Sequence, residues 1–287
     1  MNTQTVFSIV AMFYSLANLG SMGLELNLRE TLKSLRSFRV LALTLGSCWV
    51  VGPALAVLLT KLLPMEKPYA VGLLIFGLAP TAPMLPILIR KARADISLAA
   101  AIMPLAVVST VILMPLLAPL LIPGLTLSSW DISKPLLLTV LLPLVIGVVI
   151  KVYVPRVAEK IFPVVKKIAG ISTLLLLGFV VFANWRVLLS TLGSFAIAGQ
   201  VLFILGMAVP AYFIGFGLNQ AQRSAMSLAV CSRNGSAMLM AVTAFPVIDP
   251  KLMAMALLAV PVPVVVWLVM ASFLGSRAGK TVEGGSA

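Results

Sequence analysis

The residue with the most distinctive chemistry is Arg233, which lies in the polar stretch 230–236 of an otherwise apolar segment. An unpaired guanidinium at the centre of a membrane helix costs about 2.5 to 3.5 kcal/mol on insertion scales, so such a residue marks a functional site by default. The acidic residues all fall at the ends of predicted spans, in loops or in the tail: Glu25, Glu30, Glu66, Asp95, Asp131, Glu159, Asp249 and Glu283. The sequence therefore predicts a buried cation that binds an anion.

Two apolar segments are poor continuous helices. Residues 79–86 contain three prolines around Thr81, and each proline removes a backbone donor. Residues 232–236 combine Gly235 with short polar side chains, which compete with helical hydrogen bonds. An irregular backbone at membrane depth is tolerated only against protein or a water-filled cavity, so we expect both breaks to face inward.

Each break also predicts an anion site. The second half-helix is expected to begin near Pro83 or Gly235 and to turn unpaired N–H groups toward the centre, where they suit an anion. The predicted substrate site takes residues from both breaks: Thr81, Pro83, Ser232, Arg233, Asn234 and Ser236. Two alternatives stay open. Arg233 could instead bind carbonyls of the other break and tie the segments together, and Asn234 could cap a half-helix or touch substrate.

The composition places the chain in a membrane. Of its 287 residues, 61% are hydrophobic and 10% are charged, which leaves too few polar residues to cover a water-soluble surface. The net charge of +13 is dispersed between apolar segments, which argues against nucleic acid as a partner. The chain has no histidine, and Cys48 and Cys231 both sit in apolar segments, so we expect no cofactor and no confident metal site.

Hydropathy predicts an all-α multi-pass protein, because a crossing needs about 20 apolar residues. About nine spans are expected, near 5–24, 38–60, 69–89, 96–121, 135–153, 168–184, 195–218, 225–245 and 252–274. Basic residues gather in the connections after spans one, three and five: Arg29, Lys33, Arg36 and Arg39; Arg90, Lys91 and Arg93; and, in a loop after the fifth span near residue 153, Lys151, Arg156, Lys160, Lys166 and Lys167. The enrichment of cytoplasmic loops in Lys and Arg predicts an outside N-terminus and a cytoplasmic C-terminus in the plasma or inner membrane.

The positions of the two breaks suggest an inverted repeat. Residues 1–133 would form the first half with four spans, residues 134–276 the second with five, and residues 277–287 a cytoplasmic tail. Each broken span is the last but one of its half, and the two cross the bilayer in opposite directions. Discontinuous helices meeting near the midplane are a recurring plan of secondary transporters.

Three stretches together resemble the bile acid:sodium symporter family: Ser-Met-Gly-Leu-Glu-Leu at 21–26, the proline-rich break at 79–86, and Arg-Asn-Gly-Ser-Ala at 233–237. The resemblance follows the whole chain in order and implies the nine-helix form of that fold. It implies a core domain containing both broken helices, a panel of spans one, five and six, and a substrate crevice between them. Organic anions, such as bile acids, sulfated steroids and small carboxylates, are the substrates it implies.

The chain departs from this family where sodium binds. The resemblance places a glutamate and a glutamine of sodium-coupled relatives at the positions that hold Ala229 and Arg233 here. A hard cation needs several oxygen ligands, and a nearby guanidinium repels it, so these changes argue against two-sodium coupling. We expect uniport, exchange, or coupling to an ion bound weakly through hydroxyls at Thr81, Ser97, Ser232 and Ser236.

The favoured function is therefore secondary transport of a small organic anion across the lipid bilayer, with Arg233 holding the site positive. A membrane receptor or scaffold that binds the anion without moving it is the main alternative. An intramembrane enzyme fits less well, because the spans offer no nucleophile paired with a base, no carboxylate pair and no metal cluster. The sequence leaves the oligomeric state open.

Overall fold

The computed structural model describes residues 3–26, 38–122, 125, 127–183, 185–214 and 217–283, and these are helical apart from turns and one isolated two-residue bridge. Within this part of the chain, six segments are long and apolar enough to cross a membrane: Leu41–Leu62, Ile96–Leu121, Ser129–Tyr153, Pro155–Phe179, Ala196–Ile214 and Pro250–Ala278. The protein is a multi-pass membrane protein. The predicted cytoplasmic residues Arg29, Lys33 and Arg36, and Glu30 beside them, lie outside the described residues.

Prolines and glycines divide the first part of the chain. Its helices are α1 (Thr3–Glu25), α3 (Phe38–Gly46), the π-helical turn η1 (Ser47–Val51), α4 (Gly52–Leu62), α5 (Lys67–Gly77), α6 (Leu85–Lys91) and α7 (Ile96–Leu121). The prolines predicted to break the third span do so between α5 and α6. Asp95 caps α7, because its Oδ1 accepts a hydrogen bond of 2.9 Å from Leu98 N.

The second part contains the other broken helix. Its elements are α8 (Ser129–Leu136), η2 (Leu137–Leu141), α9 (Leu142–Tyr153), α10 (Pro155–Ala183), α11 (Trp185–Ser190), α12 (Ala196–Ile214), α13 (Gln220–Cys231), α14 (Gly235–Thr243), α15 (Pro250–Leu258) and α16 (Pro261–Glu283). The residues between α13 and α14 are Ser232, Arg233 and Asn234, so the second predicted break is also present.

One prediction about a connection is wrong. The basic loop expected after residue 153 is the beginning of α10, and only Val154 separates α9 from α10. Pro155 stands at the first helical position, where its missing N–H costs no hydrogen bond, and the lysines that follow are good helix formers. The positive charges at 156–167 therefore lie on a helix rather than on a loop.

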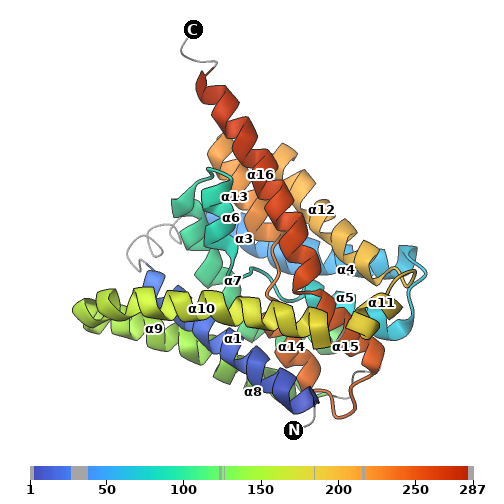
Figure 1. The fold of residues 1–287 in the computed structure, drawn as a ribbon. Coiled ribbons are helices and arrows are strands. Elements are labelled where there is room, and N and C mark those ends of the chain that lie inside the picture. The colour runs from blue at the N-terminus through green and yellow to red at the C-terminus, as the bar shows by residue number, and fades with distance from the viewer. Residues whose placement is uncertain are drawn as a thin grey trace.

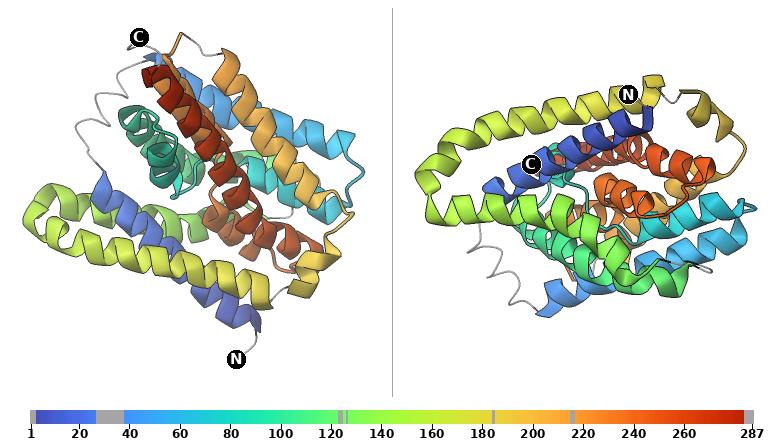
Figure 2. Two further views of the ribbon diagram at one scale, coloured as in Figure 1. Left: turned by 45° about the horizontal axis from the view of Figure 1, so that its top comes forward. Right: turned by 90° about the horizontal axis from the view of Figure 1, so that it is seen from below.

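The helices form two bodies (Figure 1). Helix α1 packs along α9 and α10, and we call these three the three-helix layer. The second body, here the crossing body, consists of α4–α7 and α12–α16, which pack on one another. Figure 2 shows from two further sides that α10 and α1 run across the outside of this body. Helix α8 touches α7 and α14 and so joins the two bodies at one end.

Close backbone contact holds the three-helix layer together. A Cβ at Gly23 of α1 would lie 2.3 Å from Leu144 O, and a Cβ at Gly147 of α9 would lie 2.5 Å from Gly20 O. Small residues let membrane helices approach in this way, where packing replaces the hydrophobic driving force that operates in water. Helices α1 and α9 therefore form a rigid pair.

We expect Gly23→Ala to lower the stability of the purified protein by about 1 to 3 kcal/mol, because the added methyl would overlap the backbone of α9. Thermal unfolding in detergent measures the change. Gly178→Ala in α10 is the matched control, since its Cβ would meet an atom only at 4.0 Å. Equal unfolding temperatures for the two variants would show that the α1–α9 contact is not tight.

Candidate functional site

The two helix breaks hydrogen-bond directly to each other. Pro80 and Arg233 form an antiparallel bridge. Thr81 N donates to Ser232 O at 2.9 Å, and Asn234 N donates to Ala79 O at 2.7 Å. A helix break leaves N–H and C=O groups without helical partners, and such groups are costly in an apolar medium. Each break therefore supplies some of the backbone partners that the other has lost.

Thr81 has a backbone conformation that β-branched residues avoid. Its φ is 65°, in the left-handed region, and its side chain is fully buried. Its hydroxyl Oγ1 has no hydrogen-bond partner among the described residues. Strain of this kind persists only where the surrounding structure enforces it, and it clusters at functional sites. The hydrogen bond from Thr81 N to the opposite break holds the residue in place.

Asn234 caps the second half-helix. Its Oδ1 accepts hydrogen bonds from Ala237 N at 3.1 Å and from Ser236 Oγ at 2.6 Å, and it is the N-cap residue of α14. Of the two roles left open by the sequence, the structure shows the cap. The amide Nδ2 is also buried, without a partner in the described part of the chain.

Arg233 is buried within the crossing body. Its exposed fraction is 1%, so the side chain neither reaches water nor faces lipid. The guanidinium carbon lies 4.7 Å from the ring centroid of Phe203 on α12, and Nη1 donates to Ser232 O at 3.2 Å. Gly52 on α4 makes room for the charged end, because a Cβ there would lie 2.9 Å from Nη2.

These contacts offset much of the cost of burying the charge, but they do not use all of the hydrogen-bond donors of the guanidinium. A desolvated cation–π contact contributes about 2 kcal/mol, and a hydrogen bond to a charged group about 1.5 to 3 kcal/mol. Burying the ion costs several kcal/mol, and an arginine does not escape this cost by losing its proton. Nε and Nη2 have no hydrogen-bond partner among the residues that the structure describes. The positive charge therefore favours an anion nearby.

A cavity of about 570 Å³ lies beside the crossing, between it and the three-helix layer. Its volume is in the range of small-molecule sites. The predicted residues Arg233 and Pro83 line it, together with Gly235, the first residue of α14. Thr81, Ser232, Asn234 and Ser236 are buried at the crossing but are not among its lining residues. Ser97 lies apart, exposed in the first turn of α7.

Sequence reasoning missed the wall opposite the crossing. Asn18 of α1 lines the cavity and donates to Tyr14 O at 2.9 Å and to Ala169 O at 3.3 Å, which links α1 to α10. In the sequence, the amide of Asn18 in the middle of the apolar span 5–24 was the feature that could have indicated this wall. Trp267 of α16 also lines the cavity; it is 2% exposed, and its indole Nε1 has no partner within the described ranges.

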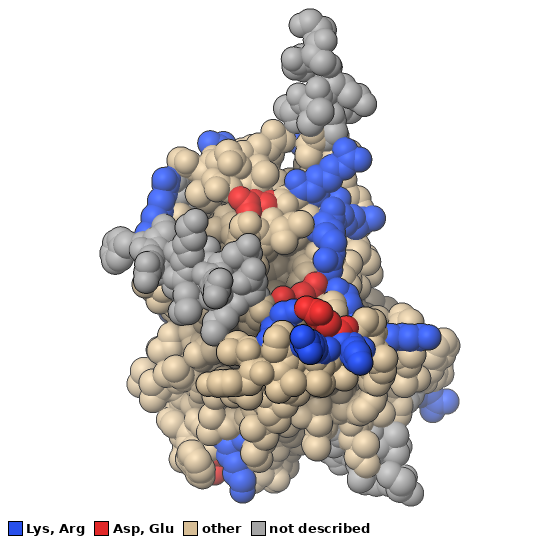
Figure 3. Space-filling model, turned by 90° about the vertical axis from the view of Figure 1, so that its left-hand side faces the viewer, with Lys and Arg blue, Asp and Glu red and all other residues tan. Residues whose placement is uncertain are grey.

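Charged side chains line the cavity farther from the crossing: Glu25 of α1, Arg90 of α6, and Lys166 and Lys167 of α10. The Glu25 carboxylate Oε1 lies 3.5 Å from Arg90 Nη2 and 3.1 Å from Lys166 Nζ. Both basic partners of Glu25 come from distant segments of the chain. Figure 3 shows the left-hand side of the molecule as drawn in Figure 1, and there a group of acidic atoms near the middle is bordered by basic side chains.

Comparison with known proteins finds one family model and several relatives, and these agree with one another. Residues 12–185 match the model of the Sodium Bile acid symporter family. The chain is 23% identical over 89% of its length to the probable sodium/metabolite cotransporter BASS3, chloroplastic, of Arabidopsis thaliana, and 23% identical over 96% of its length to the protein of the same name in Oryza sativa subsp. japonica. It is 27% identical over 64% of its length to the probable sodium/metabolite cotransporter BASS1, chloroplastic, of Arabidopsis thaliana.

These relatives are longer than the chain. The match spans 60% of the Arabidopsis BASS3 protein, 67% of its rice counterpart and 46% of BASS1.

We expect Thr81→Gly to be more stable than Thr81→Ala by about 1 kcal/mol, because glycine adopts the left-handed conformation without the clash that a Cβ produces. Both variants remove the hydroxyl, so their difference isolates the backbone contribution. The midpoint of thermal unfolding of each purified variant measures it. An alanine variant as stable as the glycine variant would show that Thr81 carries no backbone strain.

Proposed function

The chain belongs to the sodium bile acid symporter family, and we propose that it is a secondary transporter that moves a small organic anion across the membrane by alternating access. One observation carries the proposal: a cavity of ligand size lies between two separately packed bodies and is lined by a buried arginine. Alternating access needs a site that faces two bodies able to move against each other.

We further propose that the two bodies are the moving parts. The crossing body would correspond to the core implied by the family resemblance, and α1 with α8–α10 to the panel. In this proposal nine membrane crossings form an inverted repeat, with residues 1–133 and 134–276 as its halves. Two features support it: the breaks hydrogen-bond to each other, and α1 packs tightly on α9.

The cavity supports an organic anion as substrate. Most of its wall is apolar and includes methionine, proline and tryptophan side chains, which suits a hydrocarbon body. The first residue of α14 faces it, and the positive end of a helix dipole favours a carboxylate or sulfonate there. The lining contains four basic residues and one carboxylate, that of Glu25: the basic ones are Arg90, Lys166, Lys167 and Arg233. This excess of basic residues keeps the electrostatic potential of the cavity positive.

Arg233 would hold the site positive in place of a bound sodium ion. The relatives carry the words sodium/metabolite cotransporter in their names, which makes sodium coupling the obvious expectation. In this chain the guanidinium lies inside the crossing body against Phe203, next to the buried Cys48 and Cys231. The charge acts through a medium of low dielectric, where a cation both attracts a substrate anion and repels a second cation.

We propose the orientation that the basic residues predict. Arg90, Lys166 and Lys167 would face the cytoplasm of a plasma or inner membrane, so that the cavity opens on that side. The N-terminus would then lie outside, and the residues after 277 in the cytoplasm.

The first prediction from this proposal concerns sodium. We expect purified protein in liposomes to exchange labelled carboxylates or sulfonates for unlabelled ones at rates that differ less than about twofold between sodium and choline buffers, because Arg233 replaces the ion electrostatically. Counterflow measures this exchange, and protein-free liposomes are the control. Strict dependence on sodium would refute the role given to Arg233, and binding without counterflow would indicate a receptor.

The second prediction concerns the charge itself. We expect Arg233→Ala to reduce anion uptake by more than about tenfold, which corresponds to at least 1.4 kcal/mol of lost interaction, while the variant still inserts and folds. Uptake normalised to the amount of inserted protein measures the effect. Arg186→Ala is the matched control, because Arg186 is an exposed arginine of α11 that contacts Trp185 outside the cavity. Full uptake by the Arg233 variant would exclude it from the site.

A further inference from the structure

An ion pair joins the two bodies at the charged end of the cavity. Glu25 is the last residue of α1, in the three-helix layer, and Arg90 lies in the last turn of α6, in the crossing body. Their side chains meet at 3.5 Å. Of the ion pairs formed by described residues, this one alone connects the two bodies: Glu25–Lys166 lies within the layer, and Glu66–Lys251 within the crossing body. A relative movement that carries the end of α1 away from α6 would separate Glu25 from Arg90.

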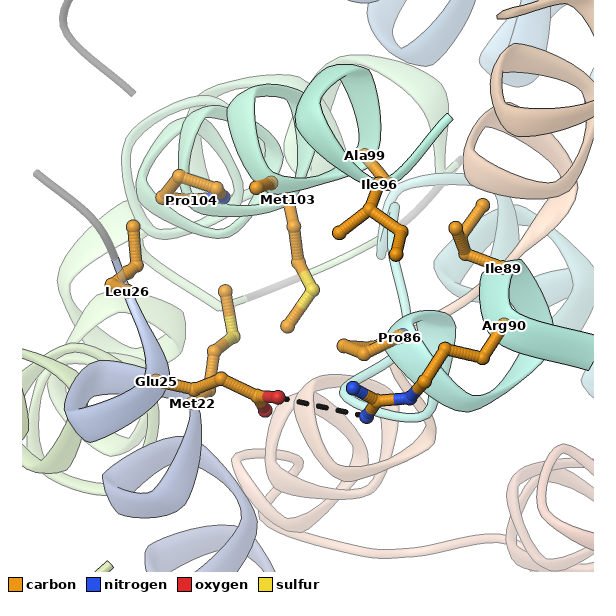
Figure 4. Close-up of a pocket in the computed structure, with 11 residues that line it drawn as sticks. Met22, Glu25, Leu26, Pro86, Ile89, Arg90, Ile96, Ala99, Met103 and Pro104 are labelled. Atoms are coloured by element: carbon orange, nitrogen blue, oxygen red, sulfur yellow. Dashed lines mark ion pairs between the residues drawn. The ribbon is translucent and has the colours of Figure 1, made fainter. Parts of the chain in front are cut away.

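The pair lines two neighbouring cavities. One is the 570 Å³ cavity that reaches the crossing, and the other is a pocket of about 170 Å³ between α1, α6 and α7. Glu25, Arg90, Met22, Pro86 and Met103 line both. Figure 4 shows the two charged side chains reaching toward each other from α1 and α6 along one side of the smaller pocket. A ligand that moved from one cavity to the other would pass the residues that line both, among them this ion pair.

Glu25 shows that a carboxylate fits between Arg90 and Lys166. Its Oε1 accepts a hydrogen bond from Lys166 Nζ at 3.1 Å and lies 3.5 Å from Arg90 Nη2, so each body supplies one basic partner. The arrangement is open to solvent, since the Arg90 and Glu25 side chains are 50% and 33% exposed. Partly exposed ion pairs are weak and therefore exchange partners readily. When Arg90 is withdrawn, Glu25 still has Lys166, a partner in its own body, so separation leaves no isolated carboxylate.

We propose that Glu25 and Arg90 form an exchangeable latch. An organic anion that enters at this end of the cavity takes the place of Glu25 on Arg90 and lays its apolar part against the methionine-lined wall. The exchange removes the ionic tie between the two bodies and frees them to move. Arg90 is thus an entry site for the carboxylate or sulfonate of the substrate, and Glu25 is a resident competitor for it. This inference rests on the proposed transport function.

A distance measurement tests the latch without any transport. Spin labels at Lys160→Cys in α10 and Gln220→Cys in α13 report the separation of the two bodies, since both positions are exposed and the native Cys48 and Cys231 are buried. We expect Glu25→Gln and Arg90→Gln each to shift the distance distribution in the same direction and to broaden it. Glu66→Gln is the matched control, because it breaks an exposed ion pair inside one body and should leave the distribution unchanged.

A carboxylate probe tests the exchange. Titration of the labelled protein with 2-naphthoate should shift the distances as Glu25→Gln does, whereas the uncharged 2-naphthamide should not. The half-saturating concentration should fall about two- to fivefold in Glu25→Gln, the range expected for a partly exposed ion pair. In Arg90→Gln, 2-naphthoate should cause no further shift.

The outcomes separate this inference from the proposed function. Distances in Glu25→Gln that match those of the unsubstituted labelled protein would overturn the latch, even if anion transport is found. No shift with 2-naphthoate, or no change of its half-saturation in Glu25→Gln, would overturn the exchange. Distances that respond as expected in a protein without counterflow would support the latch and refute the transporter.

Discussion

The structure depends on a full positive charge held inside an apolar body. Arg233 is 1% exposed, and its immediate surroundings are the aromatic face of Phe203, the space left by Gly52 and one carbonyl of its own break. Several kcal/mol are needed to place an ion there, and Nε and Nη2 of the guanidinium have no hydrogen-bond partner among the described residues. The buried charge is a property of the folded protein. In the proposed function, this charge makes the adjoining cavity attractive to an anion and unattractive to a cation.

The residue types predicted much of this arrangement because membrane physics leaves few choices. A stretch of 26 residues without a charge and with only three hydroxyl side chains is long enough to cross as a helix, and the predicted span 96–121 coincides with α7. Three prolines within seven residues, and a glycine among polar residues, interrupt the helices where the sequence places the breaks, whereas the more widely spaced prolines of α7 do not. A charge in such a segment must be buried against protein, which is where Arg233 is found.

Side-chain direction and partners at a distance could not be predicted in the same way. The sequence cannot show that Arg233 turns toward Gly52, because this depends on a missing Cβ some 180 residues away in the chain. The partners of Glu25 come from α6 and α10, which only packing brings together. The basic run after residue 153 has the composition of a loop, but Pro155 starts a helix there. Ser97 resembles the buried hydroxyls in type and differs from them in place, exposed at a helix end.

Arg233 and the Glu25–Arg90 ion pair differ in burial, and this difference suits the proposed transport cycle. Arg233 is fixed by burial, so its field acts on the cavity in every state in which the crossing stays intact. Mutual backbone hydrogen bonds, such as Asn234 N to Ala79 O at 2.7 Å, tie the breaks together and favour movement of the crossing as one piece. Glu25 and Arg90 are partly exposed and weakly paired, so an arriving anion can replace one of them at little cost. If the inner charge were exposed, water would screen it; if the outer pair were buried, its separation would leave an uncompensated ion and hold the two bodies together.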